Sequence, residues 1–351
     1  PGISDPKLTI TTKVMTSETL KHDSAVQYAL SKTDNTLKLP EKYNGLGYQN
    51  LISMVFDLMG FRDDWMREGK AKDTNTVIEP MHLVLVEEPE AHLHIQVQQV
   101  FIRQAYKVLT NHKFLKQNLN FTTQLVISTH SSHIAIETTF GNLRYFKRLP
   151  EGTECAVATS KVINLSDVFG DSDQTNKFVT RYLQSTHCDL FFADAAILVE
   201  GVAESMLLPH FIRSKFPELY QRYITILGVN GRHAHRLSPL IEKLCLPTLV
   251  ITDLDPAEKE GYHKSVVPKR GEGQISGNYA IAKWLMKEKD IDKLVDYSED
   301  KKEFSFASPY RFSIRLAYQT PVKVDFEGEE KEAIPGTFED CLIYTNYDLF
   351  K

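Results

Sequence analysis

Short apolar runs alternate with amphipathic stretches along most of the chain, and several runs end in acidic or small polar residues. Runs such as "MHLVLVEE", "QLVISTH", "AAILVE", "YITILG" and "LPTLVITD" have the length and composition of buried strands. Stretches such as "HIQVQQVFIRQAYKVLTNH" and "AESMLLPHFIRSKF" carry apolar residues at helical spacing. Strands that alternate with helices in this way predict an α/β fold with a mostly parallel sheet flanked by helices.

The chain is long enough, at 351 residues, for two domains of ordinary size. Residues 147–185 change in character, with charges, Gly, Ser and Asp in place of apolar runs. We therefore predict a first domain over 1–150, a linker over 151–188 and a second domain over 189–351. In parallel sheets, chemistry gathers at the carboxyl ends of strands. Side chains that can do chemistry stand at such ends here: Glu87, Glu88, His130, Glu200, Asp253 and Asp255.

Composition and charge narrow the class of protein further. Apolar residues make up 42% and charged residues 25%, as in globular proteins, and no run of 18 apolar residues predicts a membrane helix. Four cysteines without a C-x-x-C pair predict a reducing cytoplasm and no structural zinc. The chain begins without Met or a signal peptide, so we expect a piece of a longer protein. A net charge of −5 leaves nucleic-acid binding open, since a local patch or bound metal ions can carry it.

The first group of chemical residues fits nucleotide hydrolysis. A strand that ends in Glu87 and Glu88 can hold Mg²⁺ with one carboxylate and polarise the attacking water with the next. His130, after a neighbouring strand, could sense the γ-phosphate. "NGLGYQN" precedes an apolar helical pattern and reads as a loop that opens a helix, so it could offer backbone N–H groups to a phosphate through Gly45, Gly47 and Gln49. A Glu-Glu pair alone would more often belong to a solvated loop.

These segments together resemble the C-terminal half of an ABC-type ATPase of the SMC and DNA-repair kind. "NGLGYQN" resembles the signature motif, "LVLVEEPEAHLH" resembles Walker B with its D-loop, and "QLVISTH" resembles the switch-histidine strand. The resemblance implies that Glu87 takes the Mg²⁺ role and Glu88 the catalytic-base role, with ATP as cofactor. Glu87 stands where many relatives carry Asp. No G-x-x-x-x-G-K-[ST] loop is present, so we expect the N-terminal half of the ATPase outside this chain.

The second group is a set of carboxylates. "ILVEGVAE" places Glu200 at a strand end and Glu204 one helical turn further on. "LVITDLDP" places Asp253 and Asp255 at another strand end, where alternation would point both the same way. Glu339 lies far downstream in "GTFEDCL". Converging carboxylates need cations between them, and oxygen ligands select Mg²⁺ or Mn²⁺ over zinc. A D-x-D pair alone would more often be a capped turn.

This pattern resembles the Toprim domain of topoisomerases, DnaG-type primases and OLD-family (overcoming lysogenisation defect) nucleases. The order of ATPase then Toprim, with "FFADAAILVEGVAESMLLP", "GNYAIAKWL" and "RLAYQTPV", resembles the C-terminal part of an OLD-family nuclease of the class found in anti-phage systems. The resemblance implies a two-metal site, with Glu200, Glu204, Asp253, Asp255 and Glu339 as ligands. Basic residues after "LGVNG" fit either contact with a DNA backbone or a solvated helix start: Arg232, His233, His235 and Arg236.

The predicted function is a metal-dependent DNA endonuclease or nickase controlled by an ABC-type ATPase module. Glu200, Asp253 and Asp255 would carry the nuclease chemistry and Glu88 the ATP hydrolysis. DNA, a second copy bound through the ATPase module and a defence-system protein are the expected partners, with no membrane involved. Two rivals remain: a DNA-repair or SMC-like ATPase whose Toprim domain only binds DNA, and a topoisomerase-like strand passer, which would need a nucleophilic tyrosine among the 15 present.

Overall fold

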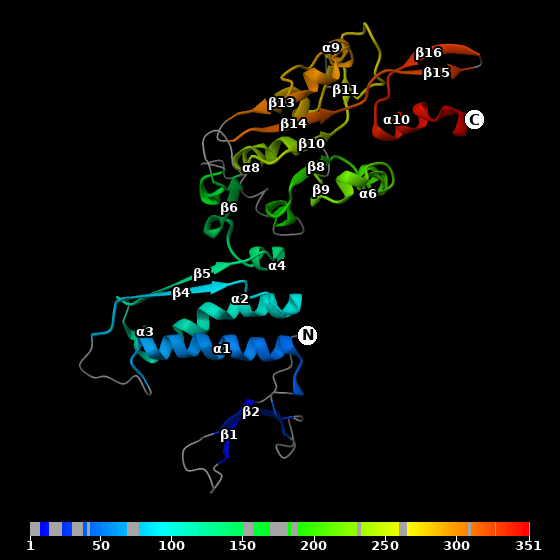
Figure 1. Ribbon diagram of the computed structural model, residues 1–351. Helices are drawn as coiled ribbons and strands as arrows, with labels where there is room; N and C mark the ends of the chain where they lie inside the picture. Colours follow the sequence, from blue (N-terminus) through cyan, green and yellow to red (C-terminus); the bar gives the residue numbers. More distant parts are fainter. Residues whose placement is uncertain are drawn as a thin grey trace. The chain divides into compact units, whose positions relative to one another are not determined.

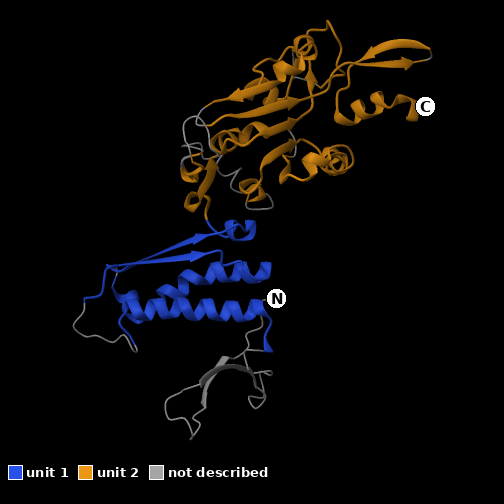
Figure 2. Ribbon diagram, viewed as in Figure 1, with its two compact units in different colours: residues 1–138 blue, residues 139–351 orange. Residues whose placement is uncertain are grey.

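The computed structural model of the chain divides into two compact units, residues 1–138 and 139–351 (Figure 2). It describes residues 8–13, 23–29, 38–40, 43–68, 77–118, 120–149, 157–168, 182–183, 188–229, 233–259, 265–307, 310–326 and 328–350. The mixed α/β class and the mostly parallel sheet predicted from the sequence are confirmed.

The described part of the first unit contains a three-stranded antiparallel sheet, a pair of parallel strands and four helices. The small sheet has the order β1-β2-β3, with strands Leu8–Lys13, Asp23–Ala29 and Lys38–Pro40. The parallel pair joins β4, Met81–Glu87, to β5, Thr122–Ser128, so the expected acidic strand pairs with the expected switch strand. The helices are α1 (Leu46–Trp65), α2 (Ile95–Thr110), α3 (Lys113–Gln117) and α4 (Ser132–Ala135).

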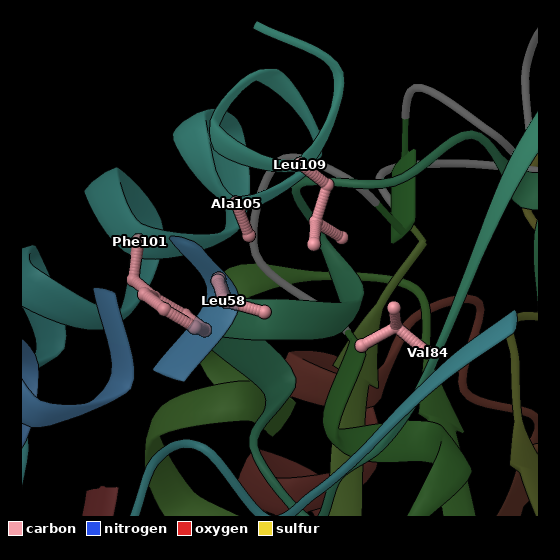
Figure 3. Packing of buried hydrophobic residues seen from close by; sticks show 5 residues of the cluster. All are labelled: Leu58, Val84, Phe101, Ala105 and Leu109. Atoms are coloured by element: carbon pink, nitrogen blue, oxygen red, sulfur yellow. The ribbon is translucent and has the colours of Figure 1, made fainter. Parts of the chain in front are cut away.

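The core of the first unit lies between helices α1 and α2 and one face of the β4–β5 pair. Figure 3 shows five of its side chains, which come from one strand and both helices: Leu58, Val84, Phe101, Ala105 and Leu109. Phe101, Ala105 and Leu109 recur every four residues along α2, so they form one stripe that packs inward. The amphipathic pattern of this stretch therefore becomes a helix whose apolar stripe supports the two functional strands.

The prediction that β4 is fully buried is wrong. Val84 is 4% exposed, but Leu83 and Leu85 on the opposite face are 52% and 67% exposed. Alternate residues of a strand point to opposite faces, and the described helices pack on one face only. Val126 of β5 is 45% exposed as well. An apolar run therefore identified a strand here, but it did not show which of the two faces is covered.

The second unit is built on a five-stranded sheet with the order β13-β14-β10-β8-β9 (Figure 1). Strands β14, β10, β8 and β9 are parallel to one another, and β13 pairs antiparallel with β14 at one edge. The strands span Ala195–Val199 (β8), Ile224–Gly228 (β9), Thr248–Ile251 (β10), Glu303–Phe306 (β13) and Phe312–Ala317 (β14). The three apolar runs expected as strands in this region are confirmed as β8, β9 and β10.

Helices and hairpins surround this sheet. The longer helices are α6 (Val202–Lys215), α8 (Ser238–Leu244), α9 (Ile291–Val295) and α10 (Phe338–Thr345), with short helices α7 (Pro217–Tyr220) and α11 (Tyr347–Phe350). A π-helical turn, η8, spans Ala280–Trp284, and 3-10 turns are η3 (Phe140–Asn142), η4 (Leu165–Asp167), η6 (Cys188–Phe191), η7 (Ala234–Leu237) and η9 (Glu299–Lys302). Paired short strands are β6 (Arg144–Leu149) with β7 (Thr159–Asn164), β11 (Pro256–Ala257) with β12 (Ile275–Ser276), and β15 (Val322–Phe326) with β16 (Glu329–Ala333).

The boundary between the compact units falls before residue 139, earlier than the expected domain end at 150. The hairpin of β6 and β7 belongs to the second unit, and β7 lies within the stretch 151–188 that we expected as a linker. Much of that stretch lies outside the described residues, so the boundaries 1–150, 151–188 and 189–351 stay a prediction. No helix in the described part of the chain is long and apolar enough to span a bilayer.

Candidate functional site: a carboxylate cluster and an ATPase-like strand pair

Neighbouring parallel strands of the second unit end at the same level of the sheet. Ile251 at the end of β10 is in register with Val199 of β8 and with Ala317 of β14. The residues that follow each strand therefore emerge side by side at one edge, Glu200 after β8 and Asp253 after β10. Because this is the carboxyl edge of a parallel sheet, the fold places the predicted acids where α/β proteins bind ligands.

Glu200 is held by three donors that all reach the same carboxylate oxygen. Its Oε2 accepts hydrogen bonds from Thr252 Oγ1 at 2.6 Å, from the backbone N–H of Asp253 at 3.2 Å and from Asn278 Nδ2 at 3.1 Å. Two of these donors belong to the turn after β10. The carboxylate of one strand end is therefore tied directly to the neighbouring strand end.

Asp253 is the carboxyl group whose protonation the cluster changes most clearly. Burial raises the pKa of Asp253 to about 7, the hydrogen bond from Gln319 opposes this rise, and the charges of Glu200, Glu204 and Asp255 add to it. The Gln319 Nε2 donates to Asp253 Oδ1 over 2.5 Å. Because the charges of Glu200, Glu204 and Asp255 act on the pKa of Asp253, these four of the five predicted metal ligands lie close together and form one cluster.

Glu204 supplies the observation that favours a cation at this cluster. It lies in the first turn of α6, is 3% exposed, and its buried Oε2 has no hydrogen-bond partner among the described residues. A Cβ on Gly201 would stand 2.5 Å from this oxygen, so the glycine leaves room for the carboxylate, and a larger residue there would displace it. A buried carboxylate oxygen without a donor is costly unless a cation contacts it.

Asp255 reaches the cluster by a route that strand alternation did not predict. β10 ends at Ile251, residues 252–255 lie outside any strand, and Asp255 has φ 48°, in the left-handed region, so the chain does not continue as an extended strand to Asp255. The Asp255 carboxylate then lies 3.3 Å from Asn278 Nδ2, and its backbone oxygen accepts from Gly277 N at 2.8 Å. Strained non-glycine backbone of this kind is frequent at ligand-binding turns.

Glu339 is the predicted ligand that no described interaction joins to the other four. It is exposed in the first turn of α10, a helix that contacts α6. The adjacent Asp340 is occupied by a capping box with Thr337, which leaves Glu339 as the acid of this pair with freedom to bind elsewhere. Among the described residues, no three His, Cys, Asp or Glu side chains converge closely enough to hold one ion as they stand. The full ligand set therefore stays a prediction.

Sequence reasoning missed the uncharged side chains that hold the carboxylates. Asn278 contacts Glu200 and Asp255, and Gln319 contacts Asp253. Both lie in stretches that the family resemblance contains, "GNYAIAKWL" and "RLAYQTPV". A polar amide that interrupts an otherwise apolar stretch is the signal that could have identified them.

In the first unit, the paired acids lie at the carboxyl end of β4, as predicted. Glu88 has φ 43° and its backbone N–H donates to Ser128 O of β5 at 2.9 Å. This turn brings its carboxylate to His130, whose Nε2 lies 3.2 Å from Glu88 Oε1. Both side chains are largely exposed. The expected catalytic base and switch histidine therefore face each other from adjacent strand ends, with Glu87 at the end of β4 beside them.

Glu90 links the same two strand ends, although no role was expected for it from the motifs. Its Oε1 accepts from Thr129 Oγ1 at 2.9 Å and from the backbone N–H of His130 at 2.6 Å. Its Oε2 is buried with no hydrogen-bond partner in the described part of the chain. Glu90 therefore holds the loop that carries the switch histidine.

The glycine segment "NGLGYQN" enters a helix earlier than predicted. α1 begins at Leu46 with Gly45 as N-cap, so Gly47 and Gln49 lie in its first turn and not in a preceding loop. A Cβ on Gly47 would stand 2.6 Å from His92 O, so glycine allows close contact between the helix start and the turn after β4. Gln49 Nε2 donates to Asn44 O at 2.9 Å. A helix N-terminus still suits a phosphate.

The basic group after β9 is only partly described. Arg232 lies outside the described residues. The imidazole of His235 packs edge-on against Tyr279, with ring centroids 5.3 Å apart. Contact with a DNA backbone and a solvated helix start both stay predictions for this group.

Comparison with known proteins matches each unit to a family. The description "AAA ATPase domain" matches residues 5–135, and "Overcoming lysogenization defect protein-like, TOPRIM domain" matches residues 191–255. The chain is 29% identical over 329 residues to Endonuclease GajA of Bacillus cereus (strain HuB5-5), covering 90% of this chain and 43% of the relative. It is 24% identical over 220 residues to Endonuclease GajA of Bacillus cereus (strain VD045), covering 63% and 33%. The chain thus spans less than half the length of these relatives.

Proposed function

We propose that the chain forms part of a metal-dependent DNA endonuclease or nickase, because it is homologous to OLD-family nucleases and joins an AAA ATPase segment to an OLD-like Toprim domain. The ATPase module would regulate the cleavage. The proposal concerns the complete protein, of which the Toprim unit would supply the cleavage site.

The observation that carries the proposal is the partly buried carboxylate cluster at the carboxyl edge of the β8–β10–β14 sheet. Glu204 brings a buried oxygen without a hydrogen-bond partner among the described residues, and Asp253 has its pKa raised to about 7 by burial. The donor set is made of carboxylate oxygens with no thiolate or imidazole, which suits Mg²⁺ or Mn²⁺ and disfavours zinc. The residues present therefore fit a hard divalent cation.

We assign the ligand roles to Glu200, Glu204, Asp253, Asp255 and Glu339. These residues would hold two divalent ions, which would supply the activation of a water for attack on a phosphodiester and the stabilisation of the leaving oxygen. The protein's part is to hold the carboxylates in place. The donors on Glu200 and the Gln319 amide on Asp253 keep these side chains oriented toward one edge of the sheet.

Cleavage of supercoiled plasmid by the chain tests the proposal, with Mg²⁺, Mn²⁺, Ca²⁺ or EDTA. We expect nicked or linear product with Mg²⁺ or Mn²⁺, and none with EDTA, Asp253→Ala or Glu200→Ala. Asp300→Ala is the matched control, since this aspartate of the same unit is exposed and lies in the η9 turn. Free 5′-phosphate and 3′-hydroxyl ends identify a nuclease, and a covalent protein–DNA link identifies a topoisomerase. Intact plasmid, here and with the full-length parent protein, would favour a module that only binds DNA.

We assign the binding of ATP with Mg²⁺ to the first unit. Glu87 would bind the ion, Glu88 would act as the catalytic base and His130 would contact the γ-phosphate. The start of α1 would face a phosphate with Gly45, Gly47 and Gln49. The 3.2 Å approach of His130 to Glu88 supports this assignment. In the full-length parent, Glu88→Gln should abolish ATP hydrolysis while ATP still binds. If this variant hydrolyses ATP at the original rate, the assignment of the base is wrong. If DNA cleavage responds to ATP equally in the full-length parent and in its Glu88→Gln variant, ATP hydrolysis does not regulate the nuclease.

A cytoplasmic anti-phage role with a defence-system partner completes the proposal. It is supported by the resemblance of the motifs to OLD nucleases of such systems. Homodimerisation through the ATPase module is part of the same proposal, because ABC-type sites are shared between two copies. Light scattering with and without ATP tests the dimer, and phage plating on cells that carry the protein or its Asp253→Ala variant tests the role.

A further inference from the structure

Asn278 lies between two of the acids that we assign as metal ligands. It follows β12 and is completely buried, at 0% exposure. Its Nδ2 lies 2.7 Å from Thr252 Oγ1, 3.1 Å from Glu200 Oε2 and 3.3 Å from Asp255 Oδ2. One amide group therefore reaches the carboxylates of two different chain segments, the end of β8 and the turn after β10.

The orientation of this amide is fixed by its other end. Asn278 Oδ1 accepts from the backbone N–H of Ala280 at 2.9 Å, at the start of the π-helical turn η8. The backbone N–H of Asn278 donates to Ser276 Oγ at 3.2 Å, and the preceding Gly277 N–H donates to Asp255 O. Because the oxygen is committed to the helix, the NH₂ group must face the carboxylates.

The amide group of Asn278 donates to three acceptors. The Thr252 hydroxyl has a single hydrogen, and it donates over 2.6 Å to Glu200 Oε2, so this hydroxyl can only accept from Asn278. The two hydrogens of the amide are therefore shared among Thr252 Oγ1, Glu200 Oε2 and Asp255 Oδ2. A positively polarised N–H at this point offsets the repulsion between the two acids and fixes their separation.

We propose that Asn278 is a positioning residue that sets the spacing of Glu200 and Asp255 for a divalent cation. The inference rests on the proposed function, because it takes these two acids as ligands. Asn278 does not contact the substrate in this account; it acts through the carboxylates. Side chains that orient metal ligands in this way change metal affinity by 10- to 100-fold when they are removed.

A buried asparagine with a purely structural role is the alternative, and the same loop supplies a control for it. Gln274 is 6% exposed, similarly buried to Asn278. Its amide accepts from Lys269 N and donates to Val267 O, both within its own loop. No described interaction joins Gln274 to the carboxylate cluster. Loss of Gln274 therefore removes a buried amide without touching the proposed ligands.

Titration of Mn²⁺ followed by electron paramagnetic resonance tests the inference on the folded chain. We expect Asn278→Ala to raise the Mn²⁺ dissociation constant at least tenfold, while Gln274→Ala stays within about twofold of the original protein. A dissociation constant in Asn278→Ala equal to that of the original protein would overturn the inference. If the original chain itself binds no Mn²⁺, the proposed metal site and this inference both fall. If it binds Mn²⁺ but leaves DNA intact, only the proposed nuclease function falls.

A second variant covers the case in which Asn278→Ala does not fold. Asn278→Asp keeps the shape and the acceptor for Ala280 N, but it replaces the donor by a third negative charge beside Glu200 and Asp255. We expect a lower thermal midpoint than the original protein in EDTA and a larger rise of that midpoint on Mn²⁺ addition. A structural role alone predicts the lower midpoint without the larger Mn²⁺ response, and that result would overturn the inference.

Discussion

The substitution Asp253→Asn tests whether the carboxylate cluster is costly to the fold and needs a cation. We expect the variant to be more stable than the original protein at pH 8 in EDTA. Burial is the main cause that raises the pKa of Asp253 to about 7, so the folded protein holds an unfavourable charge at pH 8. Asparagine has the size of the protonated acid and no charge. Its amide oxygen can accept the hydrogen bond that Gln319 Nε2 now donates to Asp253.

The magnitude follows from the pKa of this carboxyl group in the folded and unfolded chains. A rise from 3.8 to about 7, at about 1.36 kcal/mol per unit, corresponds to about 4 kcal/mol. Asp253 is partly exposed, so solvent screening reduces the figure and we expect about 2 kcal/mol. Both states carry the proton below pH ~4, so the penalty vanishes there; it grows from pH ~4 to ~7 and is complete above.

Urea unfolding at pH 5 and pH 8, with EDTA or Mn²⁺, measures this effect. The chain has two tryptophans, and Trp284 lies in the second unit, so its fluorescence in a Trp65→Phe background reports on that unit. The gain from Asp253→Asn should be smaller at pH 5, and Mn²⁺ should stabilise the original protein far more than the variant. Asp300→Asn, an exposed carboxylate, should change neither value. Lower stability of Asp253→Asn at pH 8, or an undiminished Mn²⁺ response, would refute the reasoning.

Four further substitutions give distinct outcomes. Gly47→Ala should destabilise the first unit by about 1–3 kcal/mol, because the new Cβ would stand 2.6 Å from the backbone oxygen of His92. Gly60→Ala, which has open space around it in the same helix, should stabilise the unit by up to about 1 kcal/mol. Thermal unfolding of the two variants compares these effects. Glu90→Ala should release the loop after β5, seen as faster amide hydrogen exchange there and slower ATP hydrolysis by the full-length parent, whereas unchanged exchange would argue against its holding role. Gln319→Leu should move the pH midpoint of Mn²⁺ binding upward, since the amide's hydrogen bond lowers the pKa of the aspartate it contacts, and a pH series of Mn²⁺ titrations would detect a contrary downward shift.

The sequence by itself determined the α/β class, the strands that carry the acids and the order of the two units. Apolar runs of strand length mark β4, β5, β8, β9 and β10, because a parallel strand in a core needs apolar side chains along it. Acids at their ends, such as Glu88 and Glu200, stand out since nothing in a strand requires them. The family resemblance drawn from these motifs is confirmed by the matches to an AAA ATPase domain and an OLD-like Toprim domain.

Local pattern failed where the backbone leaves regular structure. Asp255 does not continue an extended strand after β10 but adopts a left-handed conformation. The helix that we expected to begin after Gly47 already includes this glycine. Only a small residue fits at this position, because it packs closely against His92 O. The apolar run also did not predict that one face of β4 is exposed, because the same run fits a strand with one face covered or with both faces covered.

Only the tertiary structure decided which uncharged residues complete the cluster. Asn278 lies 78 residues from Glu200 in sequence, and Gln319 lies 66 residues from Asp253, yet both pairs form hydrogen bonds. An amide carries no charge pattern or periodicity that announces its partner, so its role depends on the fold that brings it to a buried carboxylate. Sequence motifs identify the groups that do chemistry, because few residue types can do it; the groups that hold them are set by distance in space, which the linear chain does not contain.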